Sequence, residues 1–228
     1  MTNTRHPSKA AARTAKAAAT QAEAQRAENR RRLTFWTVGI VLAAVLTGAL
    51  YAVFTRSTSA SGGPGGYEIG KPGPGTAAPA FTLDASTGKK ISLADYQGKT
   101  VLLYFQEGLT CQPCWDQMKD LEKQAAKVKA AGIDQVLSIT TDPADLITRK
   151  TRDMKLSTPV LADPDLAVSK TFDANSYGMM GSSRDGHTFV LVGPDGTIKW
   201  RGDYGGAPKY TMYVAPDKLL ADLQGKAK

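Results

Sequence analysis

The two cysteines, Cys111 and Cys114, restrict the fold of this chain more than any other feature. They are the only cysteines in 228 residues, and Gln112 and Pro113 separate them. An apolar run from Thr100 to Gln106, typical of a buried strand, comes before the pair. Apolar residues at helical spacing follow it: Trp115, Met118, Leu121, Ala125 and Val128. A Cys-x-x-Cys pair between a strand and an amphipathic helix is typical of an α/β redox domain.

Different roles are expected for the two thiols. A thiol at the start of a helix faces unpaired N–H groups and the positive end of the helix dipole, which favour its thiolate form. Cys114 is one turn further into the helix, where it is shielded and placed to attack a mixed disulfide on Cys111. We therefore expect Cys111 to be the nucleophile and Cys114 the resolving thiol.

Three other interpretations compete with a redox dithiol. A structural disulfide between Cys111 and Cys114 would close a loop of four residues, which constrains the unfolded chain little. A structural zinc site needs four ligands, whereas the chain offers two Cys and His187 outside its N-terminal tail. Two free thiols would not persist in an oxidising compartment, such as the extracytoplasmic location predicted below. The structural disulfide is the strongest of the three competitors.

An uncharged run near the N-terminus predicts a membrane anchor. Phe35 to Phe54 is 20 residues long, about 30 Å as a helix, which matches the core of a bilayer. Arg30, Arg31 and Arg32 stand directly before the run and Arg56 follows it. This bias predicts a single-pass protein of the cell membrane with a cytoplasmic N-terminus and an extracytoplasmic C-terminal part. A cleaved signal peptide is the competing interpretation.

The net charge of +8 does not indicate a nucleic-acid partner. Residues 1–34 hold eight Lys or Arg against two Glu, whereas residues 76–228 hold 19 basic and 18 acidic residues. The basic charge therefore belongs to a cytoplasmic tail, residues 1–34. Residues 55–75, rich in Ser, Gly and Pro, predict a flexible linker between the transmembrane helix, 35–54, and a folded domain, 76–228.

Short apolar runs alternate with amphipathic stretches from Ala77 onward, which indicates an α/β or α+β domain. Hairpins are expected at Phe81–Leu83 with Lys90–Leu93, and at His187–Val192 with Ile198–Gly202. One more strand is expected at Gln135–Thr140. Helices are expected from the cysteines to Gly132, and at Ala144–Met154, Ala167–Phe172 and Pro216–Leu223.

Five segments in this order resemble the redoxin branch of the thioredoxin superfamily. They are Ala78-Pro79-Ala80-Phe81-Thr82-Leu83, Gly98-Lys99-Thr100-Val101-Leu102-Leu103, the cysteine pair, Pro159-Val160-Leu161-Ala162-Asp163-Pro164-Asp165, and Thr188-Phe189-Val190-Leu191-Val192 before Pro194-Asp195-Gly196. This branch joins peroxiredoxins like alkyl hydroperoxide reductase with membrane-tethered thiol–disulfide oxidoreductases of the TlpA and ResA kind. The resemblance covers about Thr76 to Leu223. It implies a thioredoxin-like α/β fold, a central mixed sheet flanked by helices, and dithiol chemistry without a cofactor.

The chain departs from both kinds of relative at the expected site. Where oxidoreductases of this group carry Trp before the first cysteine and a cis-proline facing the dithiol, the chain has Thr110 and Gly186 or His187. Peroxiredoxins place Thr three residues before the peroxidatic cysteine, whereas Thr110 stands one before Cys111 and four before Cys114. Arg184 is near the position expected for the arginine of a peroxiredoxin.

Two further residues are candidate auxiliaries. The topology implied by the resemblance brings the loop before Phe189 against the dithiol, so His187 would accept a proton from Cys111 or stabilise its thiolate. A partly exposed histidine at the end of a strand is the equal alternative. Glu107, after the central strand, would relay protons to Cys114 if it were buried, but an exposed loop position is favoured.

The preferred function is thiol–disulfide exchange on a protein or small thiol or disulfide, with electrons from a membrane thiol reductant. A thiol-dependent peroxidase, with Thr110 and Arg184 as auxiliaries, is the alternative within the same class. A copper chaperone resembling the membrane-anchored Sco proteins is the alternative from another class, since Cys111, Cys114 and His187 are ligands that suit Cu(I). The sequence does not fix the substrate or the direction of electron flow.

Overall fold

A computed structural model describes residues 28, 36–37, 39–40, 42, 44–48 and 66–225. The chain divides into two compact units, residues 1–60 and 61–228. The predicted tail apart from Glu28, much of the predicted membrane segment 35–54, and the linker up to residue 65 lie outside the described residues. No helix built from the described residues combines the length and the apolar character needed to cross a bilayer.

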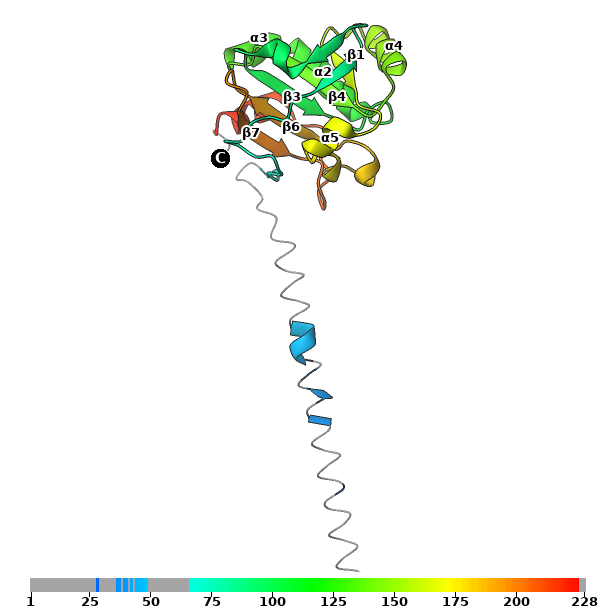
Figure 1. The fold of residues 1–228 in the computed structure, drawn as a ribbon, viewed down its shortest axis with the longest axis vertical. Helices are drawn as coiled ribbons and strands as arrows, with labels where there is room; N and C mark the ends of the chain where they lie inside the picture. Colours follow the sequence, from blue (N-terminus) through cyan, green and yellow to red (C-terminus); the bar gives the residue numbers. More distant parts are fainter. Residues whose placement is uncertain are drawn as a thin grey trace, which may run out of the picture. The chain divides into compact units, whose positions relative to one another are not determined.

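A mixed sheet of seven strands forms the centre of the second unit (Figure 1). Its spatial order is β2-β1-β5-β4-β3-β6-β7. The strands are β1 (Thr82–Ala85), β2 (Lys90–Ser92), β3 (Val101–Phe105), β4 (Gln135–Thr140), β5 (Val160–Ala162), β6 (Thr188–Val192) and β7 (Ile198–Asp203). Strands β3, β4 and β5 are parallel, whereas β1 and β6 run antiparallel to their neighbours. Strand β3 lies in the interior of the sheet, as its apolar sequence predicts.

Alternate side chains of β3 divide the core into two layers. Leu102 and Tyr104 pack with α2, α4 and α6, whereas Leu103 and Phe105 pack with α5. The helices are α2 (Gln112–Lys123), α3 (Ala125–Ala130), α4 (Ala144–Met154), α5 (Ala167–Thr171) and α6 (Pro216–Leu223). Short 3-10 turns occur at η1 (Leu93–Tyr96), η2 (Ala174–Ser176) and η3 (Gly181–Ser183). Both faces of the sheet are therefore covered, as in the predicted α/β fold.

The structure differs from the expected elements at one helix and adds one strand. The helix after the cysteines is interrupted at Gln124, which has φ −103° and ψ 23° and separates α2 from α3. The apolar pattern does not reveal this break because Leu121 and Val128, on either side of it, pack in the same core. Strand β5 was not expected, since its three residues are too few to show a periodicity.

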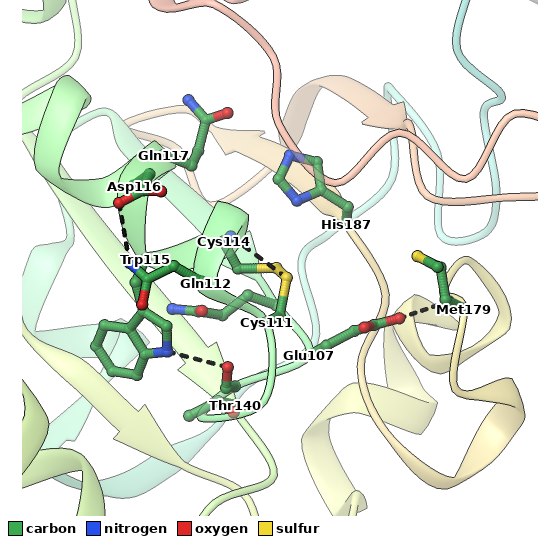
Figure 2. The surroundings of a disulfide bond; sticks show 12 residues. Glu107, Cys111, Gln112, Cys114, Trp115, Asp116, Gln117, Thr140, Met179 and His187 are labelled. Atoms are coloured by element: carbon green, nitrogen blue, oxygen red, sulfur yellow. Dashed lines mark hydrogen bonds between the residues drawn. A yellow bond between two sulfur atoms is a disulfide. The ribbon is translucent and has the colours of Figure 1, made fainter.

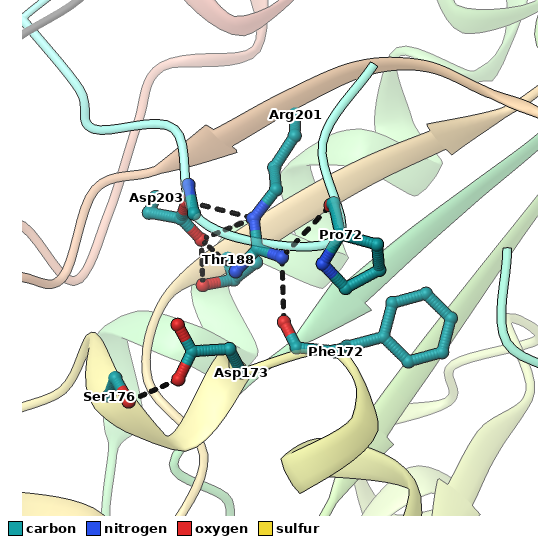
Figure 3. A network of polar contacts seen from close by, with 8 residues as sticks. Pro72, Phe172, Asp173, Ser176, Thr188, Arg201 and Asp203 are labelled. Carbon is teal, nitrogen blue, oxygen red and sulfur yellow. Dashed lines mark hydrogen bonds and ion pairs between the residues drawn. The ribbon is translucent and has the colours of Figure 1, made fainter. Parts of the chain in front are cut away.

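A buried ion pair joins the N-terminal part of the second unit to the sheet (Figure 3). Arg201 and Asp203, both on β7, have fully buried side chains with Nε and Oδ2 2.9 Å apart. Gly70 N and the Thr188 hydroxyl donate to the Asp203 carboxylate at 2.6 Å and 2.7 Å. Arg201 Nη1 donates to the carbonyl oxygens of Pro72 and Phe172. The pair thus links four separate segments of the chain.

Candidate active site

Cys111 and Cys114 form a disulfide at the start of α2, with their Cα atoms 5.3 Å apart. Cys111 occupies the N-cap position, and Cys114 N donates to its sulfur at 3.3 Å. Cys111 is 6% exposed and Cys114 is 0% exposed, while Gln112 and Pro113 between them are exposed. Of the two cysteines, Cys111 is therefore the more exposed.

Trp115 packs beneath the disulfide loop. Its side chain is fully buried, and Nε1 donates to the Gly108 carbonyl at 2.9 Å. Lys150, on α4, lies over the indole with its amino group 5.6 Å from the ring centroid. The same amino group lies 3.4 Å from Gln112 Oε1. These contacts hold the first turn of α2 against the neighbouring helix.

Glu107 is buried, with 4% exposure, so the expectation of an exposed loop position is wrong. Its carboxylate oxygen Oε1 accepts hydrogen bonds from Met179 N at 2.5 Å and Met180 N at 3.2 Å. These two donors compensate for the loss of water around the carboxylate. Figure 2 shows the Glu107 side chain extending from the loop before Cys111 toward Met179.

Arg184 stabilises the loop that leads into Cys111. Its Nη1 donates to the Glu107 carbonyl at 3.1 Å and pairs with Asp142 Oδ1 at 3.0 Å. The other oxygen of Asp142 accepts from Leu109 N at 2.6 Å. Asp142 was not predicted as a site residue, because its local sequence is that of an ordinary acidic residue before a helix. Thr110, in the same loop, is exposed.

His187 is fully buried, so the alternative of a partly exposed histidine is wrong. Its Nδ1 lies 2.9 Å from the hydroxyl of Tyr104, which also donates to the Cys114 carbonyl at 3.4 Å. Nε2 is buried without a hydrogen-bond partner among the described residues. Burial lowers the pKa of His187 to about 3, so the imidazole is neutral at physiological pH.

The backbone around His187 explains the residue types there. His187 N donates to Tyr177 O at 2.8 Å, a bond that proline could not make. A Cβ atom on Gly186 would lie 1.6 Å from the same carbonyl oxygen, so a side chain does not fit at that position. A tightly packed Gly-His pair therefore occupies the position at which the sequence comparison expected a proline.

The described residues do not assemble the copper ligands considered above. Within that part of the chain, no three His, Cys, Asp or Glu side chains lie together in an arrangement that could hold a metal ion. The geometry instead brings together a disulfide at a helix N-terminus, a neutral buried imidazole and the Glu107–Arg184–Asp142 contacts. This arrangement suits two-electron chemistry of the cysteine pair.

Proteins similar in sequence to this chain carry names that agree with this chemistry. A putative peroxiredoxin of Mycobacterium tuberculosis is 35% identical over 131 residues, which cover 55% of this chain and 81% of that protein. Peroxiredoxin Bcp of Escherichia coli is 32% identical over 128 residues, with 55% and 81% coverage. The thiol-disulfide oxidoreductase ResA of Bacillus subtilis is 27% identical over 124 residues, covering 54% of this chain and 64% of that protein.

A solved structure supports the fold. The crystal structure of peroxidoxin BcpB from M. tuberculosis superimposes with a TM-score of 0.56 at 19% identity, covering 67% of this chain and 97% of that one. The model of the AhpC/TSA family matches residues 74–201, more than half of the sequence and including both cysteines. The chain therefore belongs to the AhpC/TSA family and is a thiol-based oxidoreductase.

Proposed function

We propose that the protein catalyses thiol–disulfide exchange, with Cys111 as the nucleophile and Cys114 as the resolving thiol. The observation that carries the proposal is the disulfide at the N-terminus of α2, with Cys111 at the N-cap and slightly exposed and Cys114 fully buried. Peptide N–H groups at a helix N-terminus favour the thiolate of the outer cysteine. A buried second thiol reacts with its neighbour in preference to an external partner.

The exchange proceeds in two substitutions. The Cys111 thiolate attacks one sulfur of a substrate disulfide, which forms a mixed disulfide and releases one substrate thiolate. The Cys114 thiolate then attacks the Cys111 sulfur, which forms the Cys111–Cys114 disulfide and releases the second substrate thiolate. Two electrons pass to the substrate, and its two sulfurs take up protons from solvent. A thiol reductant must return two electrons to the enzyme before the next cycle.

The reduction potential of the full-length protein is the first test. Equilibration with glutathione or dithiothreitol buffers should give a reversible couple between roughly −300 and −100 mV. A disulfide that resists reduction far below this range would contradict the proposal and support a structural bridge. Cys114→Ser should accumulate a mixed disulfide with substrate, whereas Cys111→Ser should not. Equal trapping by both variants would contradict the assigned roles.

Peroxide reduction is the second candidate, favoured by the peroxiredoxins among the relatives. In this reaction the Cys111 thiolate attacks a hydroperoxide, forms a sulfenic acid and releases an alcohol or water. The Cys114 thiol then condenses with the sulfenic acid and releases water. Reduced protein mixed with hydroperoxide should form the disulfide within seconds, and Cys114→Ser should form a sulfenic acid that dimedone labels. Absence of both products would exclude this candidate.

We also propose that residues 35–54 anchor the enzyme in the cell membrane with the redox domain outside the cytoplasm. The 20-residue uncharged run and the arginines before it support this location. A membrane thiol reductant is the matching electron donor. The full-length protein should sediment with membranes after carbonate washing and be cleaved by protease added outside the cell. Deletion of residues 35–54 should release it, and a wild-type protein in the soluble fraction would contradict the anchor.

A further inference from the structure

Two consecutive exposed methionines are bonded to Glu107, four residues before Cys111. Met179 and Met180 are 60% and 51% exposed, in the loop between η2 and η3, and Figure 2 shows Met179. In residues 66–225 the exposed large apolar side chains are Ile69, Met179, Met180, Tyr210 and Tyr213. Methionine is flexible and polarisable, which suits a surface that accepts apolar side chains of differing shape. Neither methionine belongs to the core clusters of the domain.

Glu107 fixes the backbone of these methionines. One carboxylate oxygen accepts from both Met179 N and Met180 N, as described above. The preceding residue, Gly178, allows the approach, since a Cβ atom there would lie 2.9 Å from the same oxygen and 2.8 Å from Gly186 Cα. Arg184 holds the Glu107 carbonyl from the other side. The methionine loop and the loop that leads into Cys111 are thus joined through one buried side chain.

An open groove lies next to the cysteine pair, on the surface of α2. It begins at Pro113, follows α2 to Tyr213 and has a volume of about 430 Å³. Two acidic and two basic residues line it: Asp116, Lys119, Asp120 and Lys123. The equal numbers of acidic and basic residues favour neither a small anion nor a small cation as the ligand. An open groove suits an extended polypeptide. In Figure 2 the disulfide stands between Asp116 and Met179.

We propose that Met179 and Met180 determine specificity for polypeptide substrates by contacting an apolar side chain next to the disulfide being reduced. Glu107 is the positioning residue that holds them. Its carboxylate extends toward Met179 and not toward the sulfurs, so it acts through the loop and does not deliver protons to the thiols. The inference rests on the proposed thiol–disulfide exchange and names its substrate class.

The test compares two substrates of the reduced full-length protein, insulin and oxidised glutathione. For Met179→Gln/Met180→Gln, the ratio of kcat/KM for insulin to kcat/KM for oxidised glutathione should fall about tenfold, the effect of losing two moderate apolar contacts. Ile69→Gln, at an apolar position with 49% exposure, is the matched control and should keep the wild-type ratio within about twofold. An unchanged ratio in the methionine variant would overturn the proposal.

Variants of Glu107 separate positioning from proton transfer. Glu107→Ala should lower the ratio as the methionine variant does, because the two N–H groups lose their acceptor. Glu107→Gln should restore it, because the amide oxygen can accept the same two hydrogen bonds without carrying an acidic proton. Equal losses in both Glu107 variants would overturn the positioning role.

The rates of the wild-type protein distinguish failure of the proposed methionine role from failure of the proposed exchange. A wild-type protein that reduces oxidised glutathione but not insulin would overturn the role of the methionines alone. A wild-type protein that reduces neither would overturn the proposed exchange together with this inference.

Discussion

His187 Nδ1 lies 2.9 Å from the hydroxyl of Tyr104 in the interior of the domain, next to the first turn of α2. The two rings meet edge to face, with centroids 5.0 Å apart. Burial lowers the pKa of His187 to about 3 and raises the pKa of Tyr104 well above its usual range. Both side chains are therefore neutral across the physiological range, and they stabilise the site by packing and hydrogen bonding without charge.

The depressed pKa of His187 should destabilise the fold in acid. Between about pH 6.5 and pH 3 the unfolded chain binds a proton at this position and the folded chain does not. The free energy of unfolding should therefore fall by about 1.4 kcal/mol for each pH unit lost within this window. His187→Phe removes the titrating group and should lack this contribution. Urea unfolding of both proteins at pH 7, 5 and 4 measures it, and parallel pH profiles would contradict it.

Asp185 should have the opposite effect on how the free energy of unfolding depends on pH. It is fully buried, and neither carboxylate oxygen has a hydrogen-bond partner among the described residues. Desolvation raises its pKa well above the usual value, and the carboxylates of Asp163 and Asp142 add to this. A raised pKa stabilises the fold below the unfolded value, near pH 4, and this stabilisation is lost as the pH rises toward the folded value.

Asp185→Asn should therefore raise the melting temperature at pH 7, where the wild-type carboxyl is destabilising. The gain should shrink as the pH is lowered toward 4, because the wild-type carboxyl is then neutral in both states. Thermal unfolding followed by circular dichroism at the two pH values measures the difference. An equal or lower melting temperature for the variant at pH 7 would refute the expectation.

The Arg201–Asp203 pair should be sensitive to loss of one partner. Arg201→Met leaves the Asp203 carboxylate buried without its cation, so we expect the unfolding free energy to fall by about 3–5 kcal/mol. Arg201→Met/Asp203→Asn removes both charges and should lose less. Denaturant unfolding of the two variants tests this. A double variant less stable than the single one would contradict this and show that the Asp203 carboxylate acts chiefly through its bonds from Gly70 N and Thr188.

Gly108 should not tolerate a side chain. Its φ is +86°, and a Cβ atom would lie 1.8 Å from Asp142 Oδ2 and 2.3 Å from Thr140 Oγ1. Gly108→Ala should cost about 1–3 kcal/mol of stability and displace the loop before Cys111. Gly98→Ala, at φ +81° with open space around it, is the control for backbone strain alone. Equal losses in denaturant unfolding would mean that the contacts with Asp142 are unimportant.

Local sequence patterns were sufficient for many elements of the fold. Strand β4, α4 and α6 begin and end at the predicted residues, because their apolar periodicity and turn residues mark both ends. The hairpin of β1 and β2 also forms, although β1 is Thr82–Ala85 and not Phe81–Leu83, and β2 ends at Ser92 and not at Leu93. Strand β5 was not predicted because three residues show no periodicity. The break at Gln124 was not predicted because the apolar face of α2 continues into α3.

The sequence alone determined the chemistry that the chain offers: two cysteines, their spacing, and their place between a buried strand and a helix. These features are local, because the cysteine spacing and the start of the helix involve residues only a few positions apart in the sequence. Only the tertiary structure decided the surroundings of the pair. Glu107 and His187 are buried because segments far along the chain, Met179–Met180 and Tyr104, supply their hydrogen bonds. Burial of a polar group depends on such distant partners, which no local pattern reveals.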